Sequence, residues 1–117
     1  MVMGETNTCE CCCGAKRKWY VGTTLKILVE PTATGFDAAE DNWSVEVRYG
    51  SRDILYKKYE KSDLVDAGDG KYIAVVDTRE GVVGDVKVWV TAEIPDDDCE
   101  GGIRYEVGKS YVCTVEA

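Results

Sequence analysis

The sequence predicts an all-β protein, a two-sheet sandwich of about seven strands preceded by an extended N-terminal arm. Two observations support this prediction. Apolar residues recur with a period of two along most of the chain, as expected for strands that bury one face. Short turns rich in glycine, aspartate and proline separate these runs. We therefore divide the chain into an arm, 1–18, and a sandwich domain, 19–117.

Each predicted strand alternates apolar and polar residues. The strands are expected at 24–30, 43–49, 52–59, 71–77, 85–94, 103–107 and 110–116. The core is expected from the inward positions Leu25, Ile27, Val29, Val45, Val47, Ile73, Val75, Val86, Val88 and Val90. A turn is predicted at 107–109, a helical turn capped by Ser62 at 62–65, and the longest loop at 32–42.

The charge balance and the apolar runs limit the classes of partner. The chain has 117 residues, and 14 basic against 22 acidic side chains give a net charge of −8. An acidic surface repels phosphate backbones, so we expect no nucleic-acid partner. The apolar runs are too short to cross a bilayer, and the N-terminus lacks the pattern of a signal peptide. We expect no membrane partner and synthesis in a cytoplasm.

Six cysteines are the most unusual feature, and four of them crowd into the arm: Cys9, Cys11, Cys12 and Cys13. Adjacent cysteines pair only with strain, so a disulfide framework fits poorly. Cys9 and Cys12 have the CxxC spacing of a zinc site, but a second pair and any histidine are missing. A metal site shared between several chains stays open. In a reducing cytoplasm, Cys99 and Cys113 are expected to be free thiols, with Cys113 a small buried apolar residue.

Nothing in the sequence indicates catalysis, and we expect a protein that is not an enzyme and has no cofactor. Histidine, the commonest general base, is absent, and no pair of carboxylates has the context of an acid and a base. The acidic turn 96–98 lacks the spacing of a calcium loop. Trp19, Trp43 and Trp89 are expected in the core or at a subunit interface.

Four segments carry a resemblance to a known family. They are LKILVEP (25–31), GFDAAEDNWSVEVRY (35–49), KSDLVDAGDGKYIAVVDT (61–78) and GDVKVWVTAEIPDDDCEGGIRYEV (84–107). In this order they resemble small virion proteins of tailed phages and prophages of gut Bacteroidales, including crAss-like phages. The most specific parts are 72–78 and 90–107. The resembling segments contain no catalytic signature.

The resemblance implies an immunoglobulin-like module of the head-fibre or capsid-decoration type, often a homotrimer. Its partners would be the phage capsid protein or another virion protein, and its location the capsid surface after synthesis in the host cytoplasm. A tail- or baseplate-associated immunoglobulin-like module, related to the N-terminal domains of baseplate upper proteins, remains an alternative. A small bacterial zinc protein is the other alternative.

The arm is the segment expected to dock the module on the virion or on sister chains. It combines thiols that pack as small apolar groups with a short basic cluster suited to an acidic partner surface. The expected docking residues are Cys9, Cys11, Cys12, Cys13, Lys16, Arg17, Lys18 and Trp19.

Overall fold

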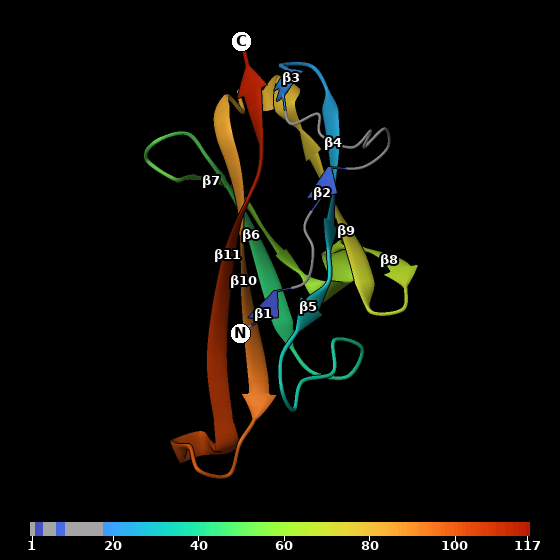
Figure 1. The fold of residues 1–117 in the computed structure, drawn as a ribbon, viewed down its shortest axis with the longest axis vertical. Helices are drawn as coiled ribbons and strands as arrows, with labels where there is room; N and C mark the ends of the chain where they lie inside the picture. The colour runs from blue at the N-terminus through green and yellow to red at the C-terminus, as the bar shows by residue number, and fades with distance from the viewer. Residues whose placement is uncertain (1, 4–6, 9–17) are drawn as a thin grey trace.

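The computed structural model describes residues 2–3, 7–8 and 18–117, with side chains from Lys18 onward, and these residues form a two-layered β-sandwich (Figure 1). Three single-turn 3₁₀ helices, η1 (Lys61–Asp63), η2 (Thr78–Glu80) and η3 (Glu100–Gly102), connect strands. The strands are β1 (Val2–Met3), β2 (Asn7–Thr8), β3 (Lys18–Tyr20), β4 (Thr24–Val29), β5 (Pro31–Thr32), β6 (Trp43–Tyr49), β7 (Ile54–Glu60), β8 (Val65–Gly68), β9 (Lys71–Asp77), β10 (Gly84–Pro95) and β11 (Ile103–Glu116).

The strand order confirms the predicted immunoglobulin-like sandwich. One sheet has the order β3-β11-β10-β6-β7 and the other β2-β4-β9-β8, while β1 pairs with β5. All neighbours are antiparallel except β3 and β11. This is the arrangement of immunoglobulin domains, in which three or four strands of one sheet face a larger sheet built on the last hairpin. The described parts of the arm are extended, and the predicted boundary at 18/19 falls inside β3.

The core lies between the two sheets and is built mainly from valine. Because side chains alternate along a strand, each strand contributes every second residue to this layer. Among the predicted core residues, those completely excluded from solvent or nearly so are Leu25, Ile27, Val29, Val45, Val47, Val86, Val88 and Val90. Trp43, Tyr59 and Ile94 extend the core toward its ends.

The predicted inward face of β9 is wrong by one residue. Ile73 is only half-buried and Val75 is exposed, whereas Tyr72, Ala74 and Val76 point into the core. The pairing with β4 explains this, since Val76 lies opposite Leu25 and Ala74 opposite Ile27, and directly paired residues share a face. Both faces of β9 are apolar, so its alternation alone is ambiguous.

Two further expectations about local structure are wrong. The strands predicted at 103–107 and 110–116 are one continuous strand, β11, and the expected turn at 107–109 lies within it. Gly108 is paired with Val90 in the ladder, so glycine here is a strand residue. The helical turn expected at 62–65 is η1, and Glu60 and Asp63 form its capping box in place of the predicted Ser62 cap.

The β10–β11 hairpin gives the molecule its length, 48 Å along the longest axis. Figure 1 shows its turn at one end of the molecule and β3 with the C-terminus at the other. Cys99 lies in that turn and Cys113 near the far end of β11, so roughly 33 Å of extended chain separates them. An intrachain bridge between them is excluded, because bridged cysteines need Cα atoms within about 7 Å. Both are unbridged in the structure.

In the part of the chain that the structure describes, no helix has the length and apolar character needed to cross a membrane.

The face assignment of β9 is testable with two neighbouring valines. V76A removes two methyl groups from a fully buried side chain and is expected to lower the free energy of unfolding by about 2 kcal/mol. V75A truncates an exposed side chain and should cost less than half as much. Urea denaturation of both variants measures the difference, and equal losses would contradict the assignment.

Candidate functional site

The predicted docking residues fall into two groups. Cys9, Cys11, Cys12, Cys13, Lys16 and Arg17 lie outside the described residues, as do the zinc candidates Cys9 and Cys12. Lys18 and Trp19 are described and belong to β3. Lys18 forms an exposed ion pair with Glu116 at 3.4 Å, while Trp19 is half-buried and packs against the core.

Short parallel pairing fixes the point where the cysteine-containing segment joins the sandwich. Lys18 lies opposite Thr114 on β11, and the N–H of Val21 donates to the carbonyl of Glu116 at 2.9 Å. β3, which follows this segment in the chain, therefore lies beside the end of β11, close to the C-terminus (Figure 1).

The three tryptophans do not form a common binding face. Trp43 is buried, its indole N–H donates to the carbonyl of Ala38 at 2.9 Å, and its ring meets Tyr72 edge-on with centroids 4.9 Å apart. Trp19 packs at the β3 end of the core, and Trp89 lies on the outer face of the larger sheet. Trp43 and Trp19 therefore serve the core, as predicted.

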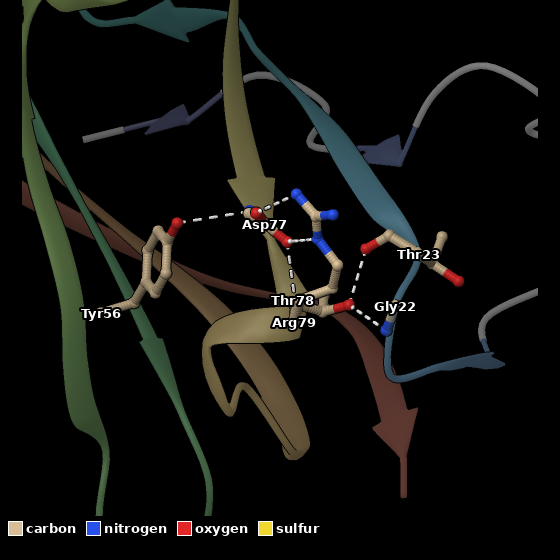
Figure 2. Close-up of polar contacts among 6 residues, drawn as sticks. All are labelled: Gly22, Thr23, Tyr56, Asp77, Thr78 and Arg79. Atoms are coloured by element: carbon tan, nitrogen blue, oxygen red, sulfur yellow. Dashed lines mark hydrogen bonds and ion pairs between the residues drawn. The ribbon is translucent and has the colours of Figure 1, made fainter.

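The end of the segment 72–78 cross-links the sandwich through a buried threonine (Figure 2). Thr78 has no exposed surface. Its hydroxyl donates to the carbonyl of Thr23 at 2.6 Å and accepts from the N–H of Gly22 at 2.9 Å. A buried hydroxyl with both bonds satisfied stabilises the turn that precedes β4.

Neighbouring groups hold η2 in place around this threonine. The carboxylate of Asp77 accepts from the N–H of Arg79 at 3.0 Å and forms two bonds with its guanidinium (Figure 2). The N–H of Asp77 donates to the hydroxyl of Tyr56 on β7. The Arg79 bonds hold the pKa of the Asp77 carboxyl below its usual value. This polar cluster has the role of a cap.

A second cluster orders the loop between β5 and β6. The ammonium of Lys61 donates to the carbonyls of Ala39 at 2.9 Å and Asp41 at 3.1 Å. The N–H of Asp37 donates to the carboxylate of Asp41 at 2.8 Å. The loop, predicted from its composition alone, is thus fastened to η1 by one lysine.

Arg104 makes the third cluster, at the base of the β10–β11 turn. Its guanidinium contacts the carboxylates of Asp96 at 3.0 Å and Glu106 at 3.0 Å, and donates to the carbonyl of Thr34 at 3.1 Å. The Asp98 N–H and the Arg104 guanidinium both donate to Asp96, and they hold the pKa of its carboxyl below the ordinary value. The acidic turn is therefore a capped structural turn.

These three clusters account for polar residues in the segments that carry the family resemblance. Thr78, Lys61 and Arg104 each join parts of the chain that are distant in sequence. Their partners are mostly backbone carbonyls, which suits residues that fix a fold. The polar residues of the resembling segments therefore stabilise the fold of the sandwich.

The outer face of the larger sheet lies outside these three clusters. At its centre the ring of Trp89 lies 4.3 Å from the guanidinium of Arg48 on β6 and 4.1 Å from the ammonium of Lys109 on β11. Beside it Lys87 donates to the carboxylate of Asp53 at 2.5 Å, and this bond lowers the pKa of Asp53. A shallow hollow of about 260 Å³ lies among these side chains.

An apolar row on β11 extends this face in both directions. Ile103, Tyr105 and Val107 lie toward the hairpin turn and Tyr111 lies on the other side of Trp89, with exposed fractions of 37%, 64%, 54% and 42%. Residues opposite one another share a face, so the pairing of Thr91 with Val107 and of Glu93 with Tyr105 places the row on the same side as Trp89. The alternation used to predict the strands does not reveal this surface, although the apolar residues at outward positions of 103–111 signal it.

The described residues offer no cluster that could hold a metal ion, and one of their two thiols is deeply buried. No three side chains of the metal-ligating types gather within them. Burial raises the pKa of the Cys113 thiol to about 12, which keeps it protonated and unsuited to bind a metal or attack a substrate. Burial also raises the pKa of Tyr59, whose hydroxyl donates to the carbonyl of Val75.

Comparison with known proteins identifies no family for this chain. No family model matches the sequence, and no curated protein matches it. Among solved structures, the chain is similar to the endo-β-1,4-mannanase from Thermotoga petrophila, with a TM-score of 0.46 and 17% sequence identity. The similarity covers 85% of this chain and 18% of the mannanase chain.

The Thr78 cross-link can be tested by a change of nearly constant shape. T78V replaces the hydroxyl with a methyl group and leaves the carbonyl of Thr23 and the N–H of Gly22 without this partner. We expect a loss of about 1–3 kcal/mol in the free energy of unfolding. T78S keeps the hydroxyl and should retain more of the stability. If T78V unfolds in urea at the same concentration as wild type, the cross-link does not stabilise the fold.

The Asp96 cluster predicts a pH dependence. A carboxyl whose pKa is lowered by folding stabilises the native state above its unfolded pKa, and this contribution disappears as the pH falls through the folded pKa. The stability difference between wild type and D96N should be constant above about pH 5 and shrink below about pH 4. Urea denaturation across this range measures it, with D97N, at an exposed neighbour, as the control. A difference independent of pH would refute the role of Asp96.

Proposed function

We propose that this chain is a non-enzymatic structural protein of a phage virion, a head-fibre or capsid-decoration module with an immunoglobulin-like fold. The observation that supports the proposal best is the structural role of the segments that resemble phage virion proteins. Their polar residues Thr78, Lys61 and Arg104 bind the sandwich's own backbone. A module of this kind acts by presenting surfaces, and the outer face around Trp89 is such a surface.

In this proposal the arm is the anchor. Cys9, Cys11, Cys12 and Cys13 lie in the chain between β2, which pairs with β4, and β3, which lies at the opposite end of the molecule from the β10–β11 turn. An anchor at one end would hold that turn away from the capsid surface. The basic residues Lys16 and Arg17 suit an acidic surface on a capsid protein, and three arms meeting on one axis would give the homotrimer that the resemblance implies.

The location can be tested on particles produced from the genome that encodes the chain. Gradient-purified particles should contain it in a fixed ratio to the major capsid protein, measured by mass spectrometry. Imaging of the particles should place it on the head. Density at the tail or baseplate would favour the alternative module, and absence from purified particles would overturn the proposal.

The anchoring role of the arm predicts the effect of two sets of substitutions. Replacing Cys9, Cys11, Cys12 and Cys13 by serine removes the thiols, and K16E with R17E reverses the basic cluster. Each set should lower incorporation into particles several-fold, because packing or charge attraction is lost. Incorporation is measured by quantitative mass spectrometry of the particles.

The matched control is K57E with K58E, which makes the same charge change at exposed residues of β7. This control should incorporate as wild type. Zinc measured in the serine variant separates the two roles of the thiols, since only a metal site would lose bound zinc. Wild-type occupancy for both arm variants would show that the anchor lies elsewhere.

A further inference from the structure

The edges of the two sheets differ in how they are protected against strand addition. Natural sheets protect their edges with lysines, short strands or bulges. The β7 edge carries Lys57 and Lys58, and β8 is a strand of 4 residues with an irregular register. Among the described residues, β3 covers only the last part of β11, at 114–116. Within the described part of the chain, no strand covers the stretch of β11 from Ile103 to Val112, and the stretch itself has no cluster of lysines.

The backbone of this stretch presents hydrogen-bonding groups to the open side. The N–H of Asp96 donates to the carbonyl of Gly102 at 3.0 Å, so this pair is hydrogen-bonded between β10 and β11. Hydrogen-bonded and non-hydrogen-bonded pairs alternate in an antiparallel ladder. The N–H and C=O groups of Ile103, Tyr105, Val107 and Lys109 therefore point away from β10. The bond from Glu93 to Asn42 on the opposite side of β10 agrees with this phase.

β1 and β2 lie near β11 without pairing with it. β1 is hydrogen-bonded to β5 and β2 to β4, and among the described residues no ladder joins either of them to β11. The outer side chains of β11 lie on the face of the larger sheet that points away from the other sheet. Its outward N–H and C=O groups lie along the edge of the larger sheet.

The sequence of the open stretch is complementary to itself when it is read in the antiparallel direction. With a two-fold axis at Val107, Tyr105 lies opposite Lys109 of a second copy, and Ile103 lies opposite Tyr111. These pairs bring a cation to an aromatic ring and join apolar side chains. On the inner side Arg104 meets Ser110 and Glu106 meets Gly108, so no like charges are opposed.

Other registers are less favourable. An axis at Glu106 or at Lys109 places two like charges directly opposite each other, which is destabilising. The register at Val107 also uses the longest stretch free of the bulge, which the ladder shows between Val86 and Lys87 opposite Tyr111 and Cys113. The stretch has one acidic and two basic residues, in a chain whose net charge is −8. The net charge of this edge is therefore slightly positive, and it would not repel a second copy as the acidic surface as a whole would.

We propose that two copies of this chain pair antiparallel through their β11 edges, with the two-fold axis at Val107, and so join their larger sheets into one continuous sheet. The contact is isologous and needs no residue of the arm. It goes beyond the proposed virion function and does not depend on it. If the arm gathers chains into trimers, the edge contact links such trimers to one another.

The first test compares two valines of similar exposure. V107K places two ammonium groups opposite each other across the axis, while V75K makes the same change on the outer face of β9, away from any edge. Sedimentation of the full-length protein over a wide concentration range should show reversible pairing for wild type and V75K. For V107K we expect pairing at least about tenfold weaker, with an unchanged melting temperature.

Two results would overturn the proposal: wild type without pairing at any concentration, or pairing of V107K equal to that of V75K. The mass of the assembly distinguishes association through the arm from association through the β11 edge. V107K would leave trimers held by the arm intact and would remove the pairing of one trimer with another. A failure of trimer formation would leave the edge dimer intact.

The second test fixes the register by cross-linking. In a background with Cys9, Cys11, Cys12, Cys13 and Cys99 replaced by serine, V107C places two thiols across the axis. The Cα atoms of a hydrogen-bonded antiparallel pair are about 5.5 Å apart, within the range of a disulfide. Y105C is the control, because its two copies would lie about 13 Å apart along the strands. Mild oxidation should give a covalent dimer for V107C only. Equal cross-linking of both variants, or none for V107C, would refute this register.

Discussion

The rest of the structure depends on the burial of one face of β10. Its inward residues from Val86 to Ile94 are completely excluded from solvent, and β10 is hydrogen-bonded to β6 on one side and to β11 on the other. A strand in this position must be apolar on one face only, because its other face forms the outer surface of the sheet. The same alternation that fills the core therefore delivers Lys87, Trp89 and Thr91 to the exterior.

Period-two alternation was sufficient to predict the strands whose outer faces are polar. It was insufficient for β9, where both faces are apolar, although Lys71 and Asp77 share the phase of Ile73 and Val75 and so mark the outer face. Gly108 predicts a turn because glycine is common in turns, but the pairing of β11 with twelve residues of β10 overrides this local preference. The candidate surface was not predicted, since it arises when β11 continues past the neighbouring β3, and strand pairing is a property of the whole fold.

Polar residues that stand out in the sequence have structural partners in the fold. Thr78, Lys61 and Arg104 each connect two parts of the chain that are far apart in sequence, and in each case one of the two is a loop or turn. Such contacts lose their value if the partner backbone moves, so they restrict the sandwich to one arrangement of its loops. The surface available for recognition is then the part of the larger sheet where side chains are exposed and contact mainly one another, around Trp89 and along β11.

The parallel pairing of β3 with β11 has a mechanical consequence. A pull on the segment before Lys18, directed along the strands, acts on the hydrogen bonds around Thr114, Val115 and Glu116 together. Bonds loaded in this way resist sliding as a group, whereas bonds at a strand end peeled sideways break one after another. If that segment attaches the module to the particle, a pulling force would load the β3–β11 hydrogen bonds along the strands, the direction in which they resist best. The strength of the attachment would then depend on this ladder as much as on the contacts of the thiols.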